Sequence, residues 1–335
     1  MKKVPVSLVT GGAGFIGSHV AKHLTKAKHK VIVLDDLSGG DKENIPTAAI
    51  FVGGSITDNK LLAKIFNRYR FDYVFHLAAY AAEGLSHFIR RFNYMNNVVG
   101  SENLINLSVK HKVKRFVFTS SIAVYGANQT PFTEETVPHP EDPYGIAKYA
   151  VELDLQAAHR LFGLNYTIFR PHNVYGERQN LNDPFRNVIG IFMRQIKRGE
   201  PMTIFGDGRQ TRAFSYIGDV APYISGCMNI NKTANQIYNI GADTPYRILD
   251  LSYMVAATMG VKPDIIHLPS RKEVIDAYSD HRKVRRDFGI KNTVPLNEGL
   301  KIVATWAKTV KLKKKAIKFQ LELSKNLPVS WKKYF

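Results

Sequence analysis

The chain has 335 residues, of which 44% are hydrophobic and 22% are charged. This composition supports one large or two modest globular domains, and it excludes a disordered, fibrous or disulfide-stapled chain. The single cysteine, Cys227, cannot form an internal disulfide, and the chain lacks the cysteine pairs that a zinc knuckle requires.

The formal net charge is +19, and about half of it lies near the C-terminus. Residues 301–335 hold ten lysines and one acidic residue, Glu322. We interpret residues 311–335 as a solvated basic tail, and we regard binding of this tail to nucleic acid as the less favoured alternative. The N-terminus has no signal-peptide core, and no apolar run reaches the roughly 18–20 residues that span a membrane, so we expect a soluble, cytoplasmic protein.

Short apolar strands alternate with helical segments over the first 170 residues. This pattern predicts an α/β fold with a Rossmann-type doubly wound parallel sheet. The predicted strands are 4–10, 31–34, 49–52, 73–77, 115–119 and 166–169, and the later helices are 58–68, 88–111 and 143–162.

Beyond Pro171 the pattern loosens, and glycine, proline and asparagine become more frequent. We expect a dinucleotide-binding domain over residues 1–175 and a smaller α/β substrate-binding lobe over residues 176–310, followed by the tail. Segments near 212–240 are candidates to return to the sheet.

A glycine-rich turn follows the first strand. Gly12, Gly14 and Gly17 match G-x-G-x-x-G, a helix follows, and Asp35 ends the next strand. The glycines let the backbone approach a pyrophosphate, and the helix N-terminus favours the anion. An acid at the position of Asp35 accepts hydrogen bonds from the adenosine ribose and repels a 2′-phosphate, so we expect NAD rather than NADP.

Tyr144 and Lys148 form a Y-x-x-x-K pair at the start of the helix predicted over 143–162. The spacing places both side chains on one helix face. An ammonium beside a phenol favours the phenolate and lowers its pKa from about 10, which makes Tyr144 a candidate general base for a sugar hydroxyl. Ser121 follows the strand 115–119 at the sheet edge that binds ligands in this architecture, and it is a candidate partner of the reacting oxygen.

In order and spacing, the chain resembles the extended short-chain dehydrogenase/reductase family, and within it the NAD-dependent nucleotide-sugar epimerases and dehydratases. The resemblance lies in VTGGAGFIGSHV, VIVLDDLSGG, FHLAA, NYMNNVVGS, FTSSIAVYG, PYGIAKYAVE, FRPHNVYGERQ, FGDGRQTRAFSYIGDV and AYSDHRKV. It implies that Ser121, Tyr144 and Lys148 are catalytic. It also implies a cofactor shell of Gly11, Gly14, Phe15, Ile16, Asp35, Asp36, Leu77, Ala78, Ala79, Asn97, Tyr144 and Lys148.

The adenine end of this shell departs from the family pattern. Family members usually have an aspartate after the third strand to hold the adenine amino group, and here Ser55 stands in its place. The contact therefore falls to Ser55, Thr57 or Asp58.

The residues after Ser121 help to sort the reactions that the resemblance allows. Dehydratases of the family typically carry an Asp-Glu pair there, and decarboxylases a glutamate before Val-Tyr-Gly, whereas this chain has Ile122 and Ala123. Loss of water needs a positioned acid and base, which these two residues cannot supply. We therefore expect a UDP-glucose/UDP-galactose 4-epimerase that keeps NAD bound. The alternatives are a 4-epimerase of UDP-glucuronate or a UDP-N-acetylhexosamine, and less favoured are a dehydratase, a decarboxylase or an RNA-binding protein without activity.

The resemblance also implies how the substrate is held. Asn173, Arg212 and Arg271 match family positions that contact the diphosphate, and a guanidinium donates two parallel hydrogen bonds to phosphate. The segment 79–84 differs from the best-known galactose epimerases, which leaves the sugar open. We expect a homodimer formed through the helices near 90–110 and 143–162, and we expect no metal ion.

Overall fold

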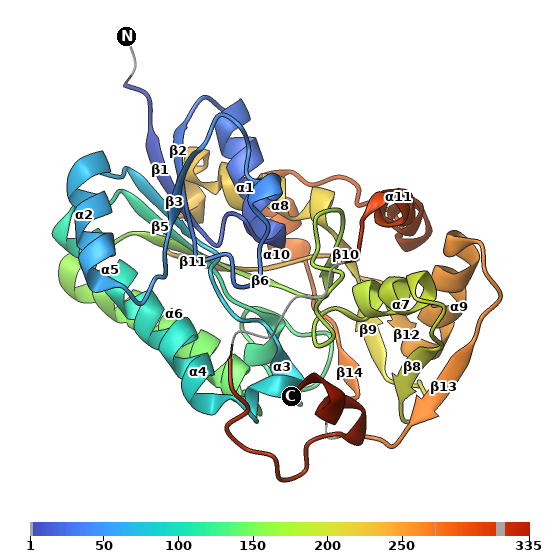
Figure 1. Ribbon diagram of the computed structural model, residues 1–335. Coiled ribbons are helices and arrows are strands. Elements are labelled where there is room, and N and C mark those ends of the chain that lie inside the picture. The colour runs from blue at the N-terminus through green and yellow to red at the C-terminus, as the bar shows by residue number, and fades with distance from the viewer. Residues whose placement is uncertain (1–2, 272, 313–318) are drawn as a thin grey trace.

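The computed structural model describes residues 3–271, 273–312 and 319–335. A seven-stranded parallel sheet forms its centre, with strand order β11-β6-β5-β4-β1-β2-β3 (Figure 1). The strands are β1 (Val6–Thr10), β2 (Lys30–Asp35), β3 (Ile50–Gly53), β4 (Tyr73–His76), β5 (Arg115–Thr119), β6 (Tyr166–Pro171) and β11 (Gln236–Ile240). The chain order reverses between β1 and β4, so the predicted doubly wound fold is confirmed.

Helices cover both faces of this sheet (Figure 1). One face carries α2 (Asn59–Tyr69), α5 (Gly100–Lys110) and α6 (Pro143–Phe162), and the other carries α1 (Phe15–Lys26), α8 (Ala221–Gly226) and α10 (Arg282–Phe288). The strands supply both cores because their side chains alternate. Leu8 packs toward α2, α5 and α6, while its neighbour Val9 packs toward α1 and α8.

The helix expected over 88–111 is interrupted. It consists of α4 (Arg90–Tyr94), a π-helical turn (Met95–Val99) and α5, preceded by the short helix α3 (Glu83–Ser86). The side chain of Asn96 donates a hydrogen bond to the carbonyl oxygen of Phe92 at this turn. Such π-turns are frequent at functional sites, and this one contains Asn97.

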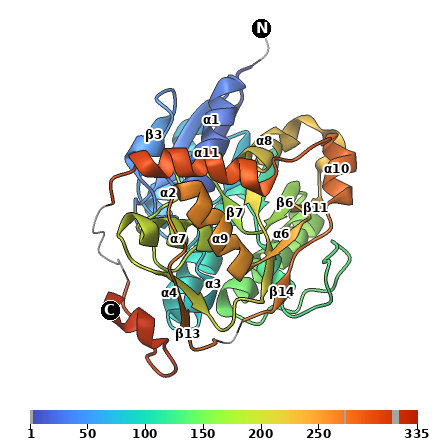
Figure 2. The ribbon, with the colours of Figure 1, turned by 90° about the vertical axis from the view of Figure 1, so that its right-hand side faces the viewer.

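A second lobe follows β6 and has its own apolar core, which includes Phe192, Leu251 and Leu300. Its helices are α7 (Val188–Lys197), α9 (Ile248–Met259) and α11 (Leu296–Thr309), and Figure 2 shows α11 lying across this lobe. Its short strands are β7 (Val174–Tyr175), β8 (Met202–Phe205), β9 (Thr211–Ala213), β10 (Ser215–Tyr216), β12 (Pro245–Arg247), β13 (Ile265–Leu268) and β14 (Asp276–Ala277).

The C-terminal residues differ from the solvated tail that the sequence suggests. Residues 313–318, which include four of the lysines, lie outside the described part of the chain. Residues 319–335, which we name the C-terminal segment, end in a 3₁₀ helix (Val329–Tyr334) and pack on α3 and α4. Leu327 and Trp331 are both buried, because apolar side chains of α3 and α4 give the segment a surface on which to bury them. No helix in the described ranges is long and apolar enough to cross a membrane.

Candidate active site

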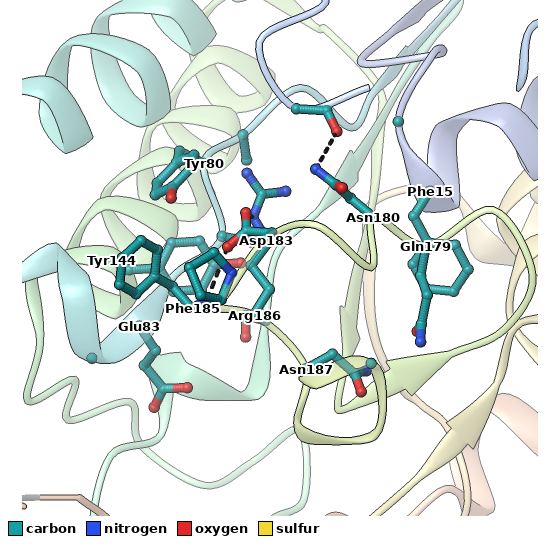
Figure 3. A pocket seen from close by; sticks show the side chains of 18 of the residues that line it. Phe15, Tyr80, Glu83, Tyr144, Gln179, Asn180, Asp183, Phe185, Arg186 and Asn187 are labelled. Atoms are coloured by element: carbon teal, nitrogen blue, oxygen red, sulfur yellow. Dashed lines mark hydrogen bonds and ion pairs between the residues drawn. The ribbon is translucent and has the colours of Figure 1, made fainter. Parts of the chain in front are cut away.

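A cavity of about 570 Å³ lies at the carboxyl ends of the sheet strands, against the second lobe. Its size is that of a typical small-molecule site. Figure 3 shows Tyr80, Tyr144 and Glu83 on one side of this cavity and Phe15 on the other. With the exception of Asn97, every residue that the family resemblance assigns to the catalytic trio, the cofactor shell or the diphosphate contacts lines this cavity. Gly12, Thr57 and Asp58, which the sequence analysis also names, are not among its lining residues.

The glycine turn packs too closely to admit side chains. Gly11 has a φ of +68°, and a Cβ there would lie 2.7 Å from the backbone nitrogen of Ala78. A Cβ at Gly17 would collide with the carbonyl oxygen of Gly11. The turn therefore exposes its backbone to the cavity at the start of α1, and these residues fit a dinucleotide pyrophosphate.

Asp35 fastens this turn. Its carboxylate accepts hydrogen bonds from the backbone nitrogens of Ala13, at 3.0 Å, and Leu37, at 2.8 Å. Burial raises the pKa of Asp35 above its usual value, although these two hydrogen bonds oppose the shift. Asp36 also lines the cavity, and its carboxylate accepts a hydrogen bond from the backbone nitrogen of Ser38.

Asn97 and Ser55 are two of the remaining positions that the sequence analysis assigns to the cofactor. Asn97 is buried behind the cavity wall, where its side chain exchanges hydrogen bonds with the backbone of Tyr80. Its amide is used by the protein itself, and the expected contact of Asn97 with the cofactor stays a prediction. At the adenine end, Ser55 lines the cavity, whereas Asp58 caps α2 by accepting a hydrogen bond from Leu61.

Ser121, Tyr144 and Lys148 meet at one point of the cavity. Asp142 caps α6 by accepting hydrogen bonds from the backbone nitrogens of Tyr144 and Gly145, and this cap fixes the helix start. The Nζ atom of Lys148 lies 5.8 Å from the centre of the Tyr144 ring. Ser121 hydrogen-bonds Tyr144, an interaction that favours the phenolate.

The protein by itself does not lower the pKa of Tyr144 as the sequence led us to expect. Burial raises this pKa above its ordinary value, and the negative charge of Glu83 adds to the effect. Burial also lowers the pKa of Lys148 to about 7, although Glu152 opposes the shift. The effect of burial on the pKa of Tyr144 outweighs the lowering that we expected from the ammonium of Lys148, four residues further along the helix. A sequence motif does not reveal this burial.

A buried ion pair lies beneath the three candidate catalytic residues. Glu152, one turn after Lys148 on α6, accepts hydrogen bonds from Arg170 on β6 and from the hydroxyl of Ser120. Arg170 also donates to the phenol oxygen of Tyr125 at 2.7 Å. The network connects α6 to β5 and β6 under the cavity floor.

The three expected diphosphate contacts come together on the second-lobe side of the cavity. Asn173 donates a hydrogen bond to the carbonyl oxygen of Ala213, next to Arg212. The guanidinium of Arg212 donates to the backbone carbonyls of Val274 and Ile275, and it lies 3.6 Å from Glu273.

Arg271 pairs with the same glutamate at 3.1 Å. Two guanidinium groups and one carboxylate leave a net positive charge, which suits a diphosphate.

Several cavity residues carry no sequence motif. The guanidinium of Arg186 lies 4.5 Å from the Tyr80 ring and pairs with Asp183 at 2.9 Å (Figure 3). The side chain of Glu83 is exposed to the cavity, and the cavity is itself surrounded by protein. The resulting loss of solvation raises the pKa of Glu83. The departure of segment 79–84 from the family pattern was the one signal that pointed to Tyr80 and Glu83.

The fold and the site define a dinucleotide-binding enzyme of the Rossmann type. The chain matches the family described as "NAD dependent epimerase/dehydratase family" over residues 7–241. The chain belongs to this family, and its cofactor is NAD.

Individual relatives agree with this assignment. The UDP-glucose 4-epimerase of Mycolicibacterium smegmatis is 32% identical over 305 residues, which cover 88% of this chain and 96% of the relative. The crystal structure of the UDP-glucose 4-epimerase of Thermotoga maritima with UDP-glucose is 38% identical and has a TM-score of 0.85, over 90% of this chain and 98% of that one.

A third relative acts on a different sugar. The UDP-glucuronic acid 4-epimerase of Bacillus cereus, solved with UDP-glucuronic acid and NAD, is 28% identical with a TM-score of 0.81, over 90% of this chain and 99% of that one. The likenesses define a nucleotide-sugar epimerase/dehydratase without selecting the sugar.

Proposed function

We propose that the protein is an NAD-dependent 4-epimerase of UDP-glucose and UDP-galactose. The observation that carries the proposal is the placement of Ser121, Tyr144 and Lys148 in one cavity with the glycine turn, without a carboxylate after Ser121. Ile122 and Ala123 are buried apolar residues of a 3₁₀ turn (Ile122–Val124). This turn offers no group to move protons during loss of water.

In the proposed reaction, the phenolate oxygen of Tyr144 takes the proton of the C4 hydroxyl, and Ser121 holds the oxygen. When bound at the glycine turn and Asp35, NAD would supply the acceptor and donor for the C4 hydride, and its positive charge would favour the phenolate. Lys148 donates a hydrogen bond to the carbonyl oxygen of Thr119, and this contact fixes helix α6, which carries Tyr144, against the end of β5. On return, Tyr144 gives the proton back to the C4 oxygen, so no net oxidation occurs.

Inversion requires that the keto sugar present its other face while the rest of the substrate stays in place. A tight grip on the diphosphate and a loose grip on the sugar meet this need. Asn173, Arg212 and Arg271 supply the first, because they converge on the second-lobe side.

UDP-glucuronate is the second candidate substrate. Arg186 contributes a positive charge at Tyr144, and a guanidinium there suits the carboxylate of a uronic acid. Its existing ion pair with Asp183 and the charge of Glu83 oppose such a substrate, so we rank it second.

The test is to incubate the purified protein with UDP-galactose without added nicotinamide and to separate the nucleotide sugars. UDP-galacturonate and UDP-N-acetylgalactosamine run in parallel, with Tyr144→Phe as the inactive control. Formation of UDP-glucose from UDP-galactose, and of UDP-galactose when the reaction starts from UDP-glucose, supports the proposal. Conversion of a parallel substrate alone would reassign the sugar, and no conversion of any of them, with NAD supplied, would contradict a 4-epimerase.

A further inference from the structure

The C-terminal segment is held at defined points on the first lobe. The carboxylate of Glu322 accepts hydrogen bonds from the backbone nitrogens of Arg91 and Phe92, at 2.7 and 2.8 Å, at the start of α4. The ring of Phe319 lies 4.9 Å from the rings of both Tyr80 and Phe92. An acid at a helix start and aromatic rings in edge-on and tilted contact are specific interactions, so the segment has a defined position on the first lobe.

Trp331 is the centre of the segment. It is 5% exposed, and its ring lies edge-on to Phe185, at 5.2 Å, and to Phe205, at 6.2 Å. Phe185 comes from the loop before α7, and Phe205 ends β8 in the second lobe. The segment therefore joins α3 and α4 of the first lobe to the second lobe.

The guanidinium of Arg271 lies over the rings of both Trp331 and Phe205. The guanidinium carbon of Arg271 lies 4.4 Å from the centre of the Phe205 ring and 5.6 Å from that of Trp331. A Cβ at Gly84 would lie 3.3 Å from the Trp331 ring and 3.5 Å from Arg271, so this side of α3 fits closely against both. Arg271 is thereby positioned by aromatic rings and by its ion pair with Glu273, and because Arg212 pairs with the same carboxylate, the cluster keeps a net positive charge for an anion.

The same segment forms part of the cavity wall. Ser330, Trp331, Lys333 and Tyr334 line the cavity that contains Tyr144. The phenol oxygen of Tyr334 accepts a hydrogen bond from Arg194 of α7 at 3.4 Å, so this wall is continuous with the second lobe. The glycine turn and Asp35 lie in the first lobe, at the cofactor's part of the cavity.

We propose that the C-terminal segment completes the substrate site, with Trp331 positioning Arg271 to bind the nucleoside diphosphate part of the substrate. The inference rests on the proposed function in that it takes the substrate to be a nucleotide sugar. Aromatic rings suit the base or ribose, and Arg271 with Lys333 suits the phosphates. A guanidinium that is already placed loses less side-chain freedom when the anion binds.

The chain offers a direct probe of this role, because it has two tryptophans. Trp306 lies on α11 and packs on the second-lobe core, so Trp306→Phe leaves Trp331 as the single emitter. We expect saturable changes in its emission on titration of the NAD-loaded protein with UDP. The matched control, Trp331→Phe, retains Trp306 and should show no such change. GDP, dTDP, CDP and ADP serve as further probes.

Affinity gives the second measurement. Trp331→Ala in the full chain should weaken UDP binding, measured by calorimetry, by about tenfold or more, the scale of a buried aromatic contact. KM for the nucleotide sugar should rise by a similar factor, while kcat and the NAD content change by less than about threefold. Trp331→Phe keeps a ring beside Arg271 and should recover most of the affinity.

The outcomes separate this inference from the proposed reaction. Emission of Trp331 that no nucleoside diphosphate alters, or parental UDP affinity in Trp331→Ala, would overturn the role of the segment even if UDP-galactose is epimerised. Emission changes and weakened binding without any epimerisation would support the segment's role and contradict the 4-epimerase. If Trp331→Ala does not fold, the emission titration, which uses the intact segment, decides alone.

Discussion

The Nζ atom of Lys148 donates a hydrogen bond of 2.8 Å to the carbonyl oxygen of Thr119, so the helix that carries Tyr144 is tied to the strand that leads to Ser121. The contact joins α6 to the end of β5. It holds Tyr144, the proposed general base, and Ser121, the proposed partner of the reacting oxygen, at a fixed separation within the protein itself. Preorganisation of this kind lowers the cost of reaching the reactive arrangement.

Removal of the Tyr144 hydroxyl should abolish turnover without unfolding the protein. Tyr144→Phe loses the proton acceptor, so we expect at least a ~100-fold fall in kcat, the usual scale for a general base. Circular dichroism and the NAD released on denaturation should match the parent. Near-parental turnover would assign proton transfer to another group.

Asp35→Ala should both loosen NAD and relax discrimination against NADP. The change removes the acceptor for the backbone nitrogens of Ala13 and Leu37, so it also loosens the glycine turn. The measurement is NAD content after gel filtration, together with the activity ratio with added NAD and NADP. Asp36→Ala is the matched control. It should change the NAD content and the activity ratio less than Asp35→Ala does, because the one hydrogen bond described for Asp36 is to the exposed backbone of Ser38. Equal effects of the two variants would contradict the role of Asp35.

Arg170→Leu should strongly destabilise the fold. It leaves the carboxylate of Glu152 buried without its cation, a loss of about 3–5 kcal/mol in the free energy of unfolding. Urea unfolding measures the change. The double variant Arg170→Leu/Glu152→Leu should recover most of it, since both charges are then absent. A double variant as unstable as the single one would mean that packing, rather than charge, determines the loss.

Acid should destabilise the protein below pH 6.5 through buried histidines. Burial lowers the pKa of His76 to about 3, and that of His172 likewise to about 3. The unfolded chain binds these protons from about pH 6.5 downward while the folded chain does not. The stability each contributes is therefore present above pH 6.5 and falls by at most about 1.4 kcal/mol per pH unit below it.

The measurement is the free energy of unfolding at several pH values between 6.5 and 5. His76→Asn should reduce the slope by up to that amount relative to the parent. Asparagine retains a polar partner for Thr10, with which His76 now shares a hydrogen bond of 2.7 Å. Parallel slopes of parent and variant would show that His76 titrates alike in both states.

The expected homodimer stays a prediction, and we expect it to form through the exposed face of α6 and the π-turn. Met95, Val99, Ile146 and Leu153 are large apolar side chains at the surface of these neighbouring helices, and exposed apolar patches mark interaction sites. Leu153→Arg should shift a dimer toward monomer in sedimentation velocity at micromolar concentration. Val137→Arg, at an exposed apolar site on a loop, should leave the mass unchanged. A monomeric parent would contradict the dimer.

Local motifs made the sheet and the reactive groups predictable. The strands follow from short apolar runs, and Tyr144 and Lys148 follow from a spacing that the helix itself enforces. The sequence did not reveal the raised pKa of Tyr144, because it shows the nearby lysine but not the burial of both groups. Nor did it place Trp331, an aromatic residue beside the C-terminal lysines whose partners Phe185 and Phe205 lie far away in the sequence.

The chain leaves the sheet after β6 to form the first part of the second lobe, re-enters the sheet at β11, which pairs directly with β6, and then forms the rest of that lobe. The excursion over residues 172–235 thus begins and ends at adjoining positions on one sheet edge. The helices α9 and α11, which follow β11, share one apolar core with α7 from this excursion, so the second lobe is assembled from two stretches of chain on either side of β11. Both stretches are therefore anchored to the sheet at its edge strand β11, and the second lobe cannot be exchanged as one continuous insert.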